Sequence, residues 1–130
     1  MLFHTFSTQE ERRRFGGSDF IELQYCRLER GTSFRKLTSA CRTHWEDDSL
    51  YVPAQRMDEL LAAYSDVLGE ALYPNKKSGP VYPFGPNYYP PERVPAMLGR
   101  LRERNSEDDR TLAKWLQKAA EHNGFYVLGV

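Results

Sequence analysis

The chain is poor in cysteine and contains no long apolar run. Cys26 and Cys41 are its only cysteines; they are too few for a disulfide framework, and a reducing compartment would keep both as thiols. Residues 1–6 are followed by charged residues instead of a continuous apolar segment, so the sequence predicts neither a signal peptide nor a membrane span. We therefore expect a cytoplasmic protein without a membrane partner.

The chain also carries no excess of positive or negative charge. The 130 residues carry 18 basic and 18 acidic side chains, and this balance does not indicate a nucleic-acid partner. The charges are nevertheless unevenly distributed. Residues 46–70 hold seven acidic side chains and one basic one, whereas residues 71–105 hold six basic and two acidic ones. Such asymmetry can steer a charged partner, although helices often carry a charged solvent face for no such reason.

No motif for catalysis or metal binding is present. The sequence lacks a phosphate-binding glycine loop, a nucleophile elbow and a paired-histidine helix motif. Cys41 and His44 have a two-residue gap but no second pair at zinc-site spacing, and Glu46, Asp47 and Asp48 lack the periodic spacing of a calcium loop. We expect a protein that is not an enzyme and that binds no metal and no cofactor.

Two alternatives stay open at this stage. One is a small enzyme with a cysteine/histidine site, since such sites assemble from distant positions; the available residues are Cys26, Cys41, His4, His44 and His122. The other is a small-molecule-binding domain, which a deep apolar cavity would favour.

The hydrophobic pattern predicts a single α+β domain over residues 1–130, a two-layer sandwich of a mainly antiparallel sheet packed against helices. Short strands are expected at residues 2–6, 19–29, 49–52 and 125–128, and residues 33–41 are expected to return as the second strand of a hairpin, although they also fit a helical stripe. Helices are expected between residue 7 and the glycines at 16 and 17, over residues 53–68 and 91–104, and after a capping box of Ser106 with Asp109.

Prolines and aromatics concentrate between residues 70 and 91, where a long loop is expected. Prolines recur every third residue at 80, 83 and 86, the period of a polyproline II helix. The loop carries Tyr82, Phe84, Tyr88 and Tyr89, which either plug the sheet or anchor a protein partner. We treat these four rings as candidate anchors, and we treat a second group as a candidate charged contact: Trp45, Glu46, Asp47 and Asp48.

The second half of the chain resembles small bacterial proteins that are similar to the immunity proteins encoded beside secreted or contact-delivered toxins. The resemblance lies in residues 85–94, in Trp115 and Leu116, and in residues 122–129, with a further part at residues 45–53. It implies a stoichiometric inhibitor without a cofactor, which stays in the cytoplasm, binds a toxin domain and occludes its active site. Partners of basic nuclease toxins are often acidic overall, and this chain is not.

Overall fold

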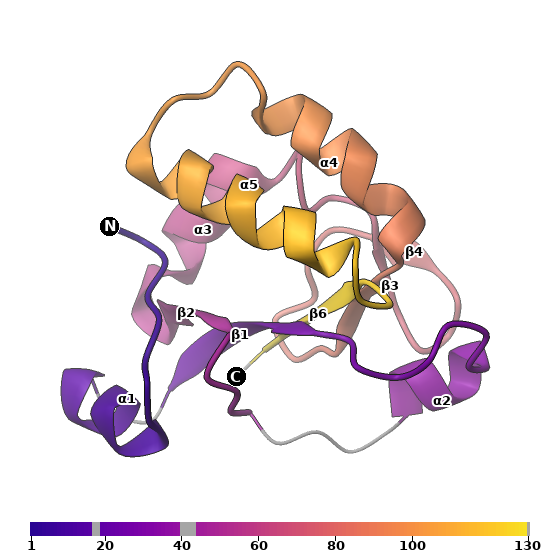
Figure 1. Ribbon diagram of the computed structural model, residues 1–130, viewed down its shortest axis with the longest axis horizontal. Coiled ribbons are helices and arrows are strands. Elements are labelled where there is room, and N and C mark those ends of the chain that lie inside the picture. Colours follow the sequence, from indigo (N-terminus) through magenta and orange to yellow (C-terminus); the bar gives the residue numbers. More distant parts are fainter. Residues whose placement is uncertain (17–18, 40–43, 130) are drawn as a thin grey trace.

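Short helices and short strands follow one another along the chain (Figure 1). The computed structural model describes residues 1–16, 19–39 and 44–129. The helices are α1 (Gln9–Gly16), α2 (Phe34–Ser39), α3 (Met57–Tyr64), α4 (Val94–Leu101) and α5 (Glu107–Ala119), and the 3-10 turns η1 (Ala54–Arg56) and η2 (Pro91–Arg93) precede α3 and α4. The strands are β1 (Phe20–Tyr25), β2 (Leu50–Pro53), β3 (Ala71–Leu72), β4 (Ser78–Gly79), β5 (Asn87–Tyr89) and β6 (Phe125–Leu128).

The strands form one antiparallel sheet in the order β2-β1-β6-β5-β3-β4. The last strand in the sequence, β6, lies in the interior of this sheet. Phe125 of β6 is opposite Tyr25 of β1 on one side and Tyr89 of β5 on the other, and Val127 is opposite Leu23 and Asn87. All four residues of β6 are buried, which confirms that the apolar run at residues 125–128 forms a closing strand away from the sheet edge.

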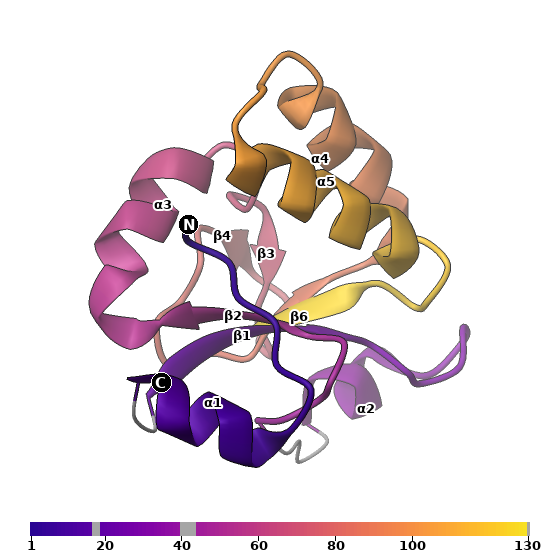
Figure 2. The same ribbon diagram turned by 60° about the vertical axis from the view of Figure 1, so that its left-hand side comes forward.

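The main hydrophobic core fills the space between one face of the sheet and α3, α4 and α5 (Figure 2). Alternate strand residues point into it because successive side chains of a strand face opposite sides. Its members include Leu23, Tyr89, Phe125 and Val127 from the strands, and Leu60, Met97 and Leu116 from the three helices. The observed architecture confirms the predicted α+β fold of a mainly antiparallel sheet packed against helices.

The other face of the sheet is covered by α1, α2 and the connections beside them (Figure 2). Leu37 of α2 packs in a small cluster with Tyr88, Tyr126 and Leu128, and the Tyr126 hydroxyl donates to the Leu37 carbonyl at 2.7 Å. A second small cluster contains Phe6, Phe20 and Tyr51. Both faces of the sheet are therefore shielded from water at β1, β2, β5 and β6.

The prediction of a hairpin strand over residues 33–41 was wrong for its described part. Residues 34–39 form α2, because Ser33 caps the first turn by accepting a hydrogen bond from the Lys36 backbone at 3.3 Å, and Phe34 and Leu37 point to the same side at helical spacing. The place beside β1 is taken by β2, which pairs Leu50 with Leu23 and Val52 with Ile21.

The predicted loop at residues 70–91 contains β3, β4 and β5. Its prolines flank the strands and do not interrupt them, so β5 donates and accepts hydrogen bonds between Pro86 and Pro90. At the start of the chain, His4 pairs with Tyr51 through two backbone hydrogen bonds of 2.9 and 2.8 Å, but residues 2–6 extend this pairing no further.

The predicted start of α5 is confirmed. Ser106 accepts a hydrogen bond from the Asp109 backbone at 3.1 Å, and the Asp109 carboxylate accepts one from the Ser106 backbone at 3.0 Å, which is a capping box. Among the described residues, no helix combines the length and the apolar composition that crossing a membrane requires.

Because β6 pairs with strands on both sides, we expect large-to-small changes in it to be severe. Phe125→Ala removes a ring stacked on Tyr89 at 4.6 Å in the main core, and this should lower the free energy of unfolding by about 3 to 5 kcal/mol. The matched control is Phe84→Ala. The Phe84 ring is largely exposed, so its removal should lower the free energy of unfolding by less than about 0.5 kcal/mol. Urea denaturation followed by circular dichroism measures both. Equal effects of the two substitutions would contradict the placement of β6.

Candidate functional site

The structure divides the four candidate aromatic anchors into an exposed pair and a buried pair. Tyr82 and Phe84 are 52% and 68% exposed, whereas Tyr88 and Tyr89 are 3% and 0% exposed. Of the four candidate anchors, only Tyr82 and Phe84 are therefore displayed. Tyr88 and Tyr89 plug the sheet, which is the other role that the sequence left open.

Tyr88 and Tyr89 are buried because both belong to the interior strand β5, on opposite faces of the sheet. The Tyr88 hydroxyl donates to the Asn123 carbonyl and the Tyr89 hydroxyl to the Leu68 carbonyl, each at 2.7 Å. Burial raises the pKa of both tyrosines, so the hydroxyls stay protonated and keep donating. Both rings serve the fold in the free protein.

The exposed pair sits on a turn that a buried side chain holds in place. Asn87 is fully buried; its side-chain oxygen accepts a hydrogen bond from the Tyr82 backbone at 2.7 Å, and its amide nitrogen donates to the Tyr82 and Val127 carbonyls at 3.0 Å. Gly85 closes the turn by donating its backbone N–H to the Tyr82 carbonyl at 2.9 Å. A polyproline II helix has no internal hydrogen bonds, so the period-three prolines here stiffen a turn instead.

The same turn lies in close contact with the residue that follows β6. A Cβ placed on Gly129 would come within 1.8 Å of the Pro83 carbonyl oxygen, so only glycine allows this approach. Gly85 is similarly enclosed, since a Cβ there would come within 2.6 Å of the Asn87 amide nitrogen. The turn is therefore packed directly onto the backbone of the sheet's interior strand.

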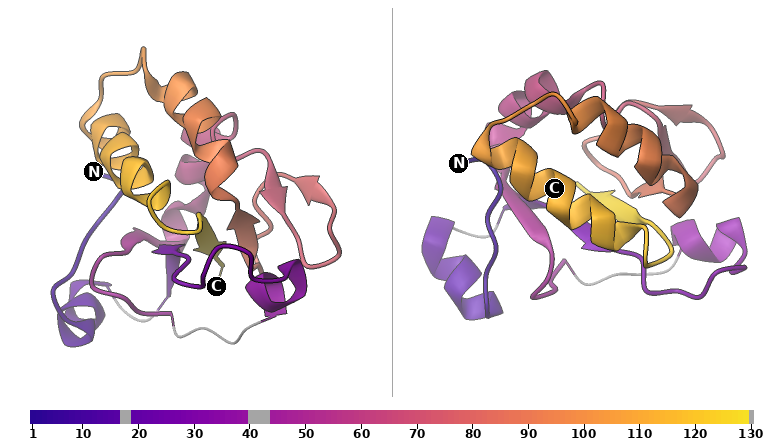
Figure 3. Two further views of the ribbon diagram at one scale, coloured as in Figure 1. Left: turned by 45° about the vertical axis from the view of Figure 1, so that its right-hand side comes forward. Right: turned by 45° about the horizontal axis from the view of Figure 1, so that its top comes forward.

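The two exposed rings continue into a third. Tyr82 and Phe84 meet edge to face with centroids 5.7 Å apart, and Tyr73 meets Tyr82 at 6.3 Å. The Tyr73 hydroxyl also donates to the Pro80 carbonyl, which ties the β3–β4 hairpin to the turn. This hairpin lies at the side of the molecule (Figure 3, left panel). We call the surface formed by Tyr73, Tyr82 and Phe84 the aromatic surface.

Two lysines lie on the hairpin that carries Tyr73. Lys76 and Lys77 occupy the tip of the β3–β4 hairpin, where Tyr73 accepts a hydrogen bond from Lys76 at its carbonyl and donates its own N–H to the Lys77 carbonyl, both at 2.9 Å. Both lysines are exposed, and neither forms an ion pair with any residue that the structure describes. The hairpin that carries Tyr73 therefore has a basic tip.

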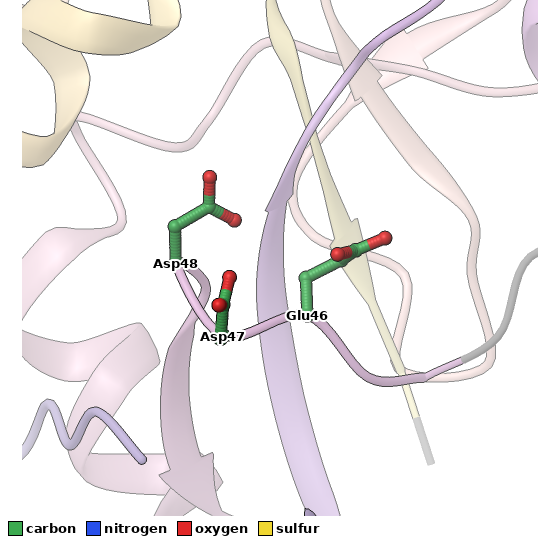
Figure 4. Close-up of side chains that lie close together, drawn as sticks. All are labelled: Glu46, Asp47 and Asp48. Atoms are coloured by element: carbon green, nitrogen blue, oxygen red, sulfur yellow. The ribbon is translucent and has the colours of Figure 1, made fainter. Parts of the chain in front are cut away.

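The acidic candidates lie on one turn before β2, apart from the aromatic surface. Glu46, Asp47 and Asp48 each place a carboxylate oxygen within 4.8 Å of the others (Figure 4). Arg27 supplies positive charge at this turn, since its guanidinium pairs with Asp48 and lies 3.8 Å from Glu46. Because β2 and the β3–β4 hairpin are at opposite ends of the strand order, the structure does not bring the acidic turn and the aromatic surface together.

Trp45, the fourth member of the predicted charged contact, is partly buried. Its ring stacks on Tyr51 with centroids 5.7 Å apart, and the Arg12 guanidinium lies 5.6 Å from its centre. The Trp45 side chain therefore covers the face of the sheet opposite the main core, and only part of its surface is accessible to a partner.

The thiol and imidazole candidates have separate surroundings in the described part of the chain. Cys26 is buried, with its Sγ 3.4 Å from the Tyr126 hydroxyl. His4 packs on Phe15 at 4.6 Å, and burial together with the nearby chain terminus lowers its pKa. His122 stacks on Tyr25 at 4.6 Å, and His44 is exposed. No hydrogen bond joins a thiol to an imidazole among these residues, and Cys41 lies outside the described residues.

A buried polar cluster was missed by the sequence reasoning. Glu22 of β1 is fully buried, and one of its carboxylate oxygens accepts hydrogen bonds from Ser49 at 2.6 Å, Gln24 at 3.1 Å and Tyr51 at 3.2 Å. Its other oxygen has no partner in the part of the chain that the structure describes. The alternation of β1 assigned Glu22 to solvent, and no local signal showed that residues far along the chain cover this face.

We expect Asn87→Ala to loosen the turn and to destabilise the protein. The substitution removes three hydrogen bonds and leaves the Tyr82 backbone N–H without its partner, so unfolding should become easier by about 2 to 4 kcal/mol. Asn75→Ala is the control, because it removes one exposed contact to the Lys77 backbone and should cost less than about 1 kcal/mol. Chemical denaturation provides the free energies. A cost for Asn87→Ala no larger than that of the control would show that this side chain does not hold the turn.

The pH dependence of stability should reveal Glu22. Burial raises the pKa of its carboxyl above the ordinary value of 4.5. The folded state therefore keeps the proton to higher pH than the unfolded state, and the stability that this carboxyl contributes is lost as pH rises from about 4.5 through the raised pKa. Glu22→Gln has no proton to lose, so its stability relative to the parent protein should increase across this window and stay constant below it.

Glu59→Gln is the control for the pH experiment. A hydrogen bond from Arg56 lowers the pKa of Glu59, so the ionised form of this carboxyl favours the fold, and the substitution should lower relative stability as pH rises. Urea denaturation at a series of pH values records both variants. A Glu22→Gln effect that does not change with pH would be incompatible with a buried carboxyl of raised pKa.

Comparisons with known proteins add no assignment to these surfaces. The resemblance to immunity proteins stays an expectation from the sequence, and the functional proposal depends on the geometry of this chain. No protein-family model, no curated protein and no solved structure matches the chain.

Proposed function

We propose that this chain is a non-enzymatic protein-binding domain, an immunity protein that neutralises a cognate bacterial toxin domain by docking through its aromatic surface. The observation that carries the proposal is the exposure of Tyr82 and Phe84 on a turn that the buried Asn87 fixes. Exposed aromatic side chains of this size are costly to leave in water. Their display on a fixed backbone favours a role in binding.

The geometry of the turn suits tight association. Binding costs conformational entropy when loops and side chains become ordered, and a preformed turn avoids much of that cost. Aromatic residues are enriched among the few interface positions that contribute most to affinity. The Tyr82 ring already contacts both Phe84 and Tyr73, so the rings are partly ordered before a partner arrives.

The hairpin that carries Tyr73 suggests a chemistry for the proposed partner. Lys76 and Lys77 lie at its tip and carry unpaired positive charge within the described structure. A toxin surface with an apolar centre and an acidic edge complements this arrangement, and charge complementarity raises the rate of association. The Arg27 ion pairs reduce the charge of the acidic turn, so we give that turn a secondary role in recognition.

The alternative of a cysteine/histidine enzyme has less support from the geometry. The described thiol of Cys26 is buried beside Tyr126 and has no imidazole partner in the described residues. A nucleophile of this kind needs an adjacent base within hydrogen-bond reach. The binding proposal uses residues that are both exposed and fixed, and we therefore prefer it.

Co-expression tests the proposal directly. We expect the neighbouring reading frame to encode a large secreted protein; its C-terminal domain would be expressed in bacteria with and without the chain, and growth and co-purification would be measured. We expect growth to stop with the toxin domain alone and to resume when the chain is present. The double variant Tyr82→Ser/Phe84→Ser should weaken the complex by about 100-fold or more, because two anchor positions are lost.

The matched control is Phe15→Ser. Its ring is 53% exposed, as Tyr82 is, but it lies at the end of α1 against His4 and Phe6, so the complex should keep its affinity. Thermal unfolding of all variants verifies that each remains folded. Growth that is arrested equally with and without the chain would contradict the immunity function, and full protection by the double variant would remove the aromatic surface from recognition.

A further inference from the structure

A cleft of about 350 Å³ lies where four separate segments of the chain meet. One wall belongs to α5 and the residues just after it, and the opposite wall belongs to the N-terminal segment and the turn before β2. The N-terminal segment is attached at the start of α5, because the Leu2 backbone donates to the Asp108 carboxylate at 2.9 Å. Figure 1 shows this segment passing the start of α5 on its way to α1.

The α5 wall carries a row of hydrogen-bond donors. Thr111, Lys114, Lys118 and His122 line the cleft, and their spacing of three, four and four residues places them on one side of a helix. The row reaches past the end of α5 because the His122 backbone donates to the Lys118 carbonyl at 3.3 Å. Neither lysine forms an ion pair within the described chain. Two exposed lysines one helical turn apart thus line the same cleft.

The floor of the cleft is apolar and already packed. It consists of Tyr25, Leu50 and Trp115, all of which are buried. Tyr25 and Trp115 stack with centroids 4.1 Å apart and an interplanar angle of 12°, and the Trp115 indole N–H donates to the Asp48 carbonyl at 2.8 Å. The Trp115 ring is held by the stacked Tyr25 ring and by the hydrogen bond to Asp48, so the floor keeps its shape without a ligand.

The opposite wall adds little competing charge. Its two members are Thr5 and Asp48, and the Asp48 carboxylate is paired with Arg27. Glu121, which also lies close enough to Tyr25 to influence its ionisation, does not line the cleft. The positive groups of α5 therefore dominate the polar side of the cleft, and the rings dominate the other.

We propose that this cleft binds a small anionic ligand with a flat apolar body, such as an aromatic carboxylate, whose anionic group contacts Lys114 and Lys118 and whose rings cover Tyr25, Leu50 and Trp115. Its volume is at the lower end of ligand pockets, which suits one or two rings. An apolar floor with a few convergent polar groups is the usual composition of such sites. The two lysines provide the selectivity for charge.

The cleft is separate from the aromatic surface. It adjoins Tyr25 at the C-terminal end of β1, whereas the turn of Tyr82 and Phe84 packs on Gly129 beyond the C-terminal end of β6. These strands are antiparallel, with Tyr25 opposite Phe125 and Glu22 opposite Leu128. The two sites thus adjoin opposite ends of the same strand pair, and the ligand proposal does not depend on the toxin-binding proposal.

Titration with naphthalene-1-carboxylate tests the site, and naphthalene-1-carboxamide is the matched neutral probe. Amide and indole shifts in ¹H–¹⁵N NMR spectra provide the readout. Trp115 and Trp45 give the two indole signals, which Trp45→Phe assigns. We expect the Trp115 signal to move saturably with the carboxylate and the Trp45 signal to stay in place. The carboxylate should bind about tenfold more tightly than the carboxamide, because two exposed lysines each contribute a modest ionic interaction.

Charge variants locate the anionic contact. Lys114→Gln/Lys118→Gln should bring carboxylate affinity down to that of the carboxamide while leaving carboxamide affinity unchanged. Lys76→Gln/Lys77→Gln removes the same charge at the tip of the β3–β4 hairpin and should leave both affinities unchanged. Equal binding of the two probes, an unaffected carboxylate affinity in the Lys114/Lys118 variant, or the absence of a saturable Trp115 shift at millimolar concentrations would each overturn the proposal.

Discussion

The hydrogen bonding of β6 between β1 and β5 is the interaction on which the rest of the structure depends. The strand comes last in the sequence but lies in the interior of the sheet, where it joins β1 near the start of the chain to β5 in its second half. Its side chains complete the main core on one face and the cluster beneath α2 on the other. Its backbone also accepts a hydrogen bond from Asn87, which fixes the exposed turn.

Local sequence patterns were sufficient where local interactions decide the structure. Three features were predicted correctly because each depends on residues only a few positions apart: the capping box of Ser106 and Asp109, the helical stripe through α5 and the apolar run of β6. The α+β fold follows from these elements. Residues 33–41 were ambiguous for the same reason, since β-strand and helical periodicities coincided and the Ser33 cap decided in favour of α2.

Pairing between strands that are far apart in the sequence could not be predicted from local sequence patterns. The prolines around residues 80–91 argued for a loop, yet Tyr88 and Tyr89 lie in a strand because β6 and β3 come from elsewhere to pair with it. Glu22 likewise looked solvent-facing until Ser49 and Tyr51 closed over it. The sequence grouped all four aromatic candidates in one segment, but only the tertiary structure separates the displayed rings of Tyr82 and Phe84 from the buried pair.

The way the exposed turn is held has a consequence for how recognition can change. The fixing contacts use the Asn87 side chain and backbone groups of Tyr82, Gly85, Val127 and Gly129, so they are indifferent to which side chains the turn carries at positions 82 and 84. Substitutions at these two positions alter the contacting groups while the scaffold stays the same. In the proposed binding function, such a separation lets partner preference change by single substitutions, because substitutions at positions 82 and 84 leave the contacts that fix the turn in place.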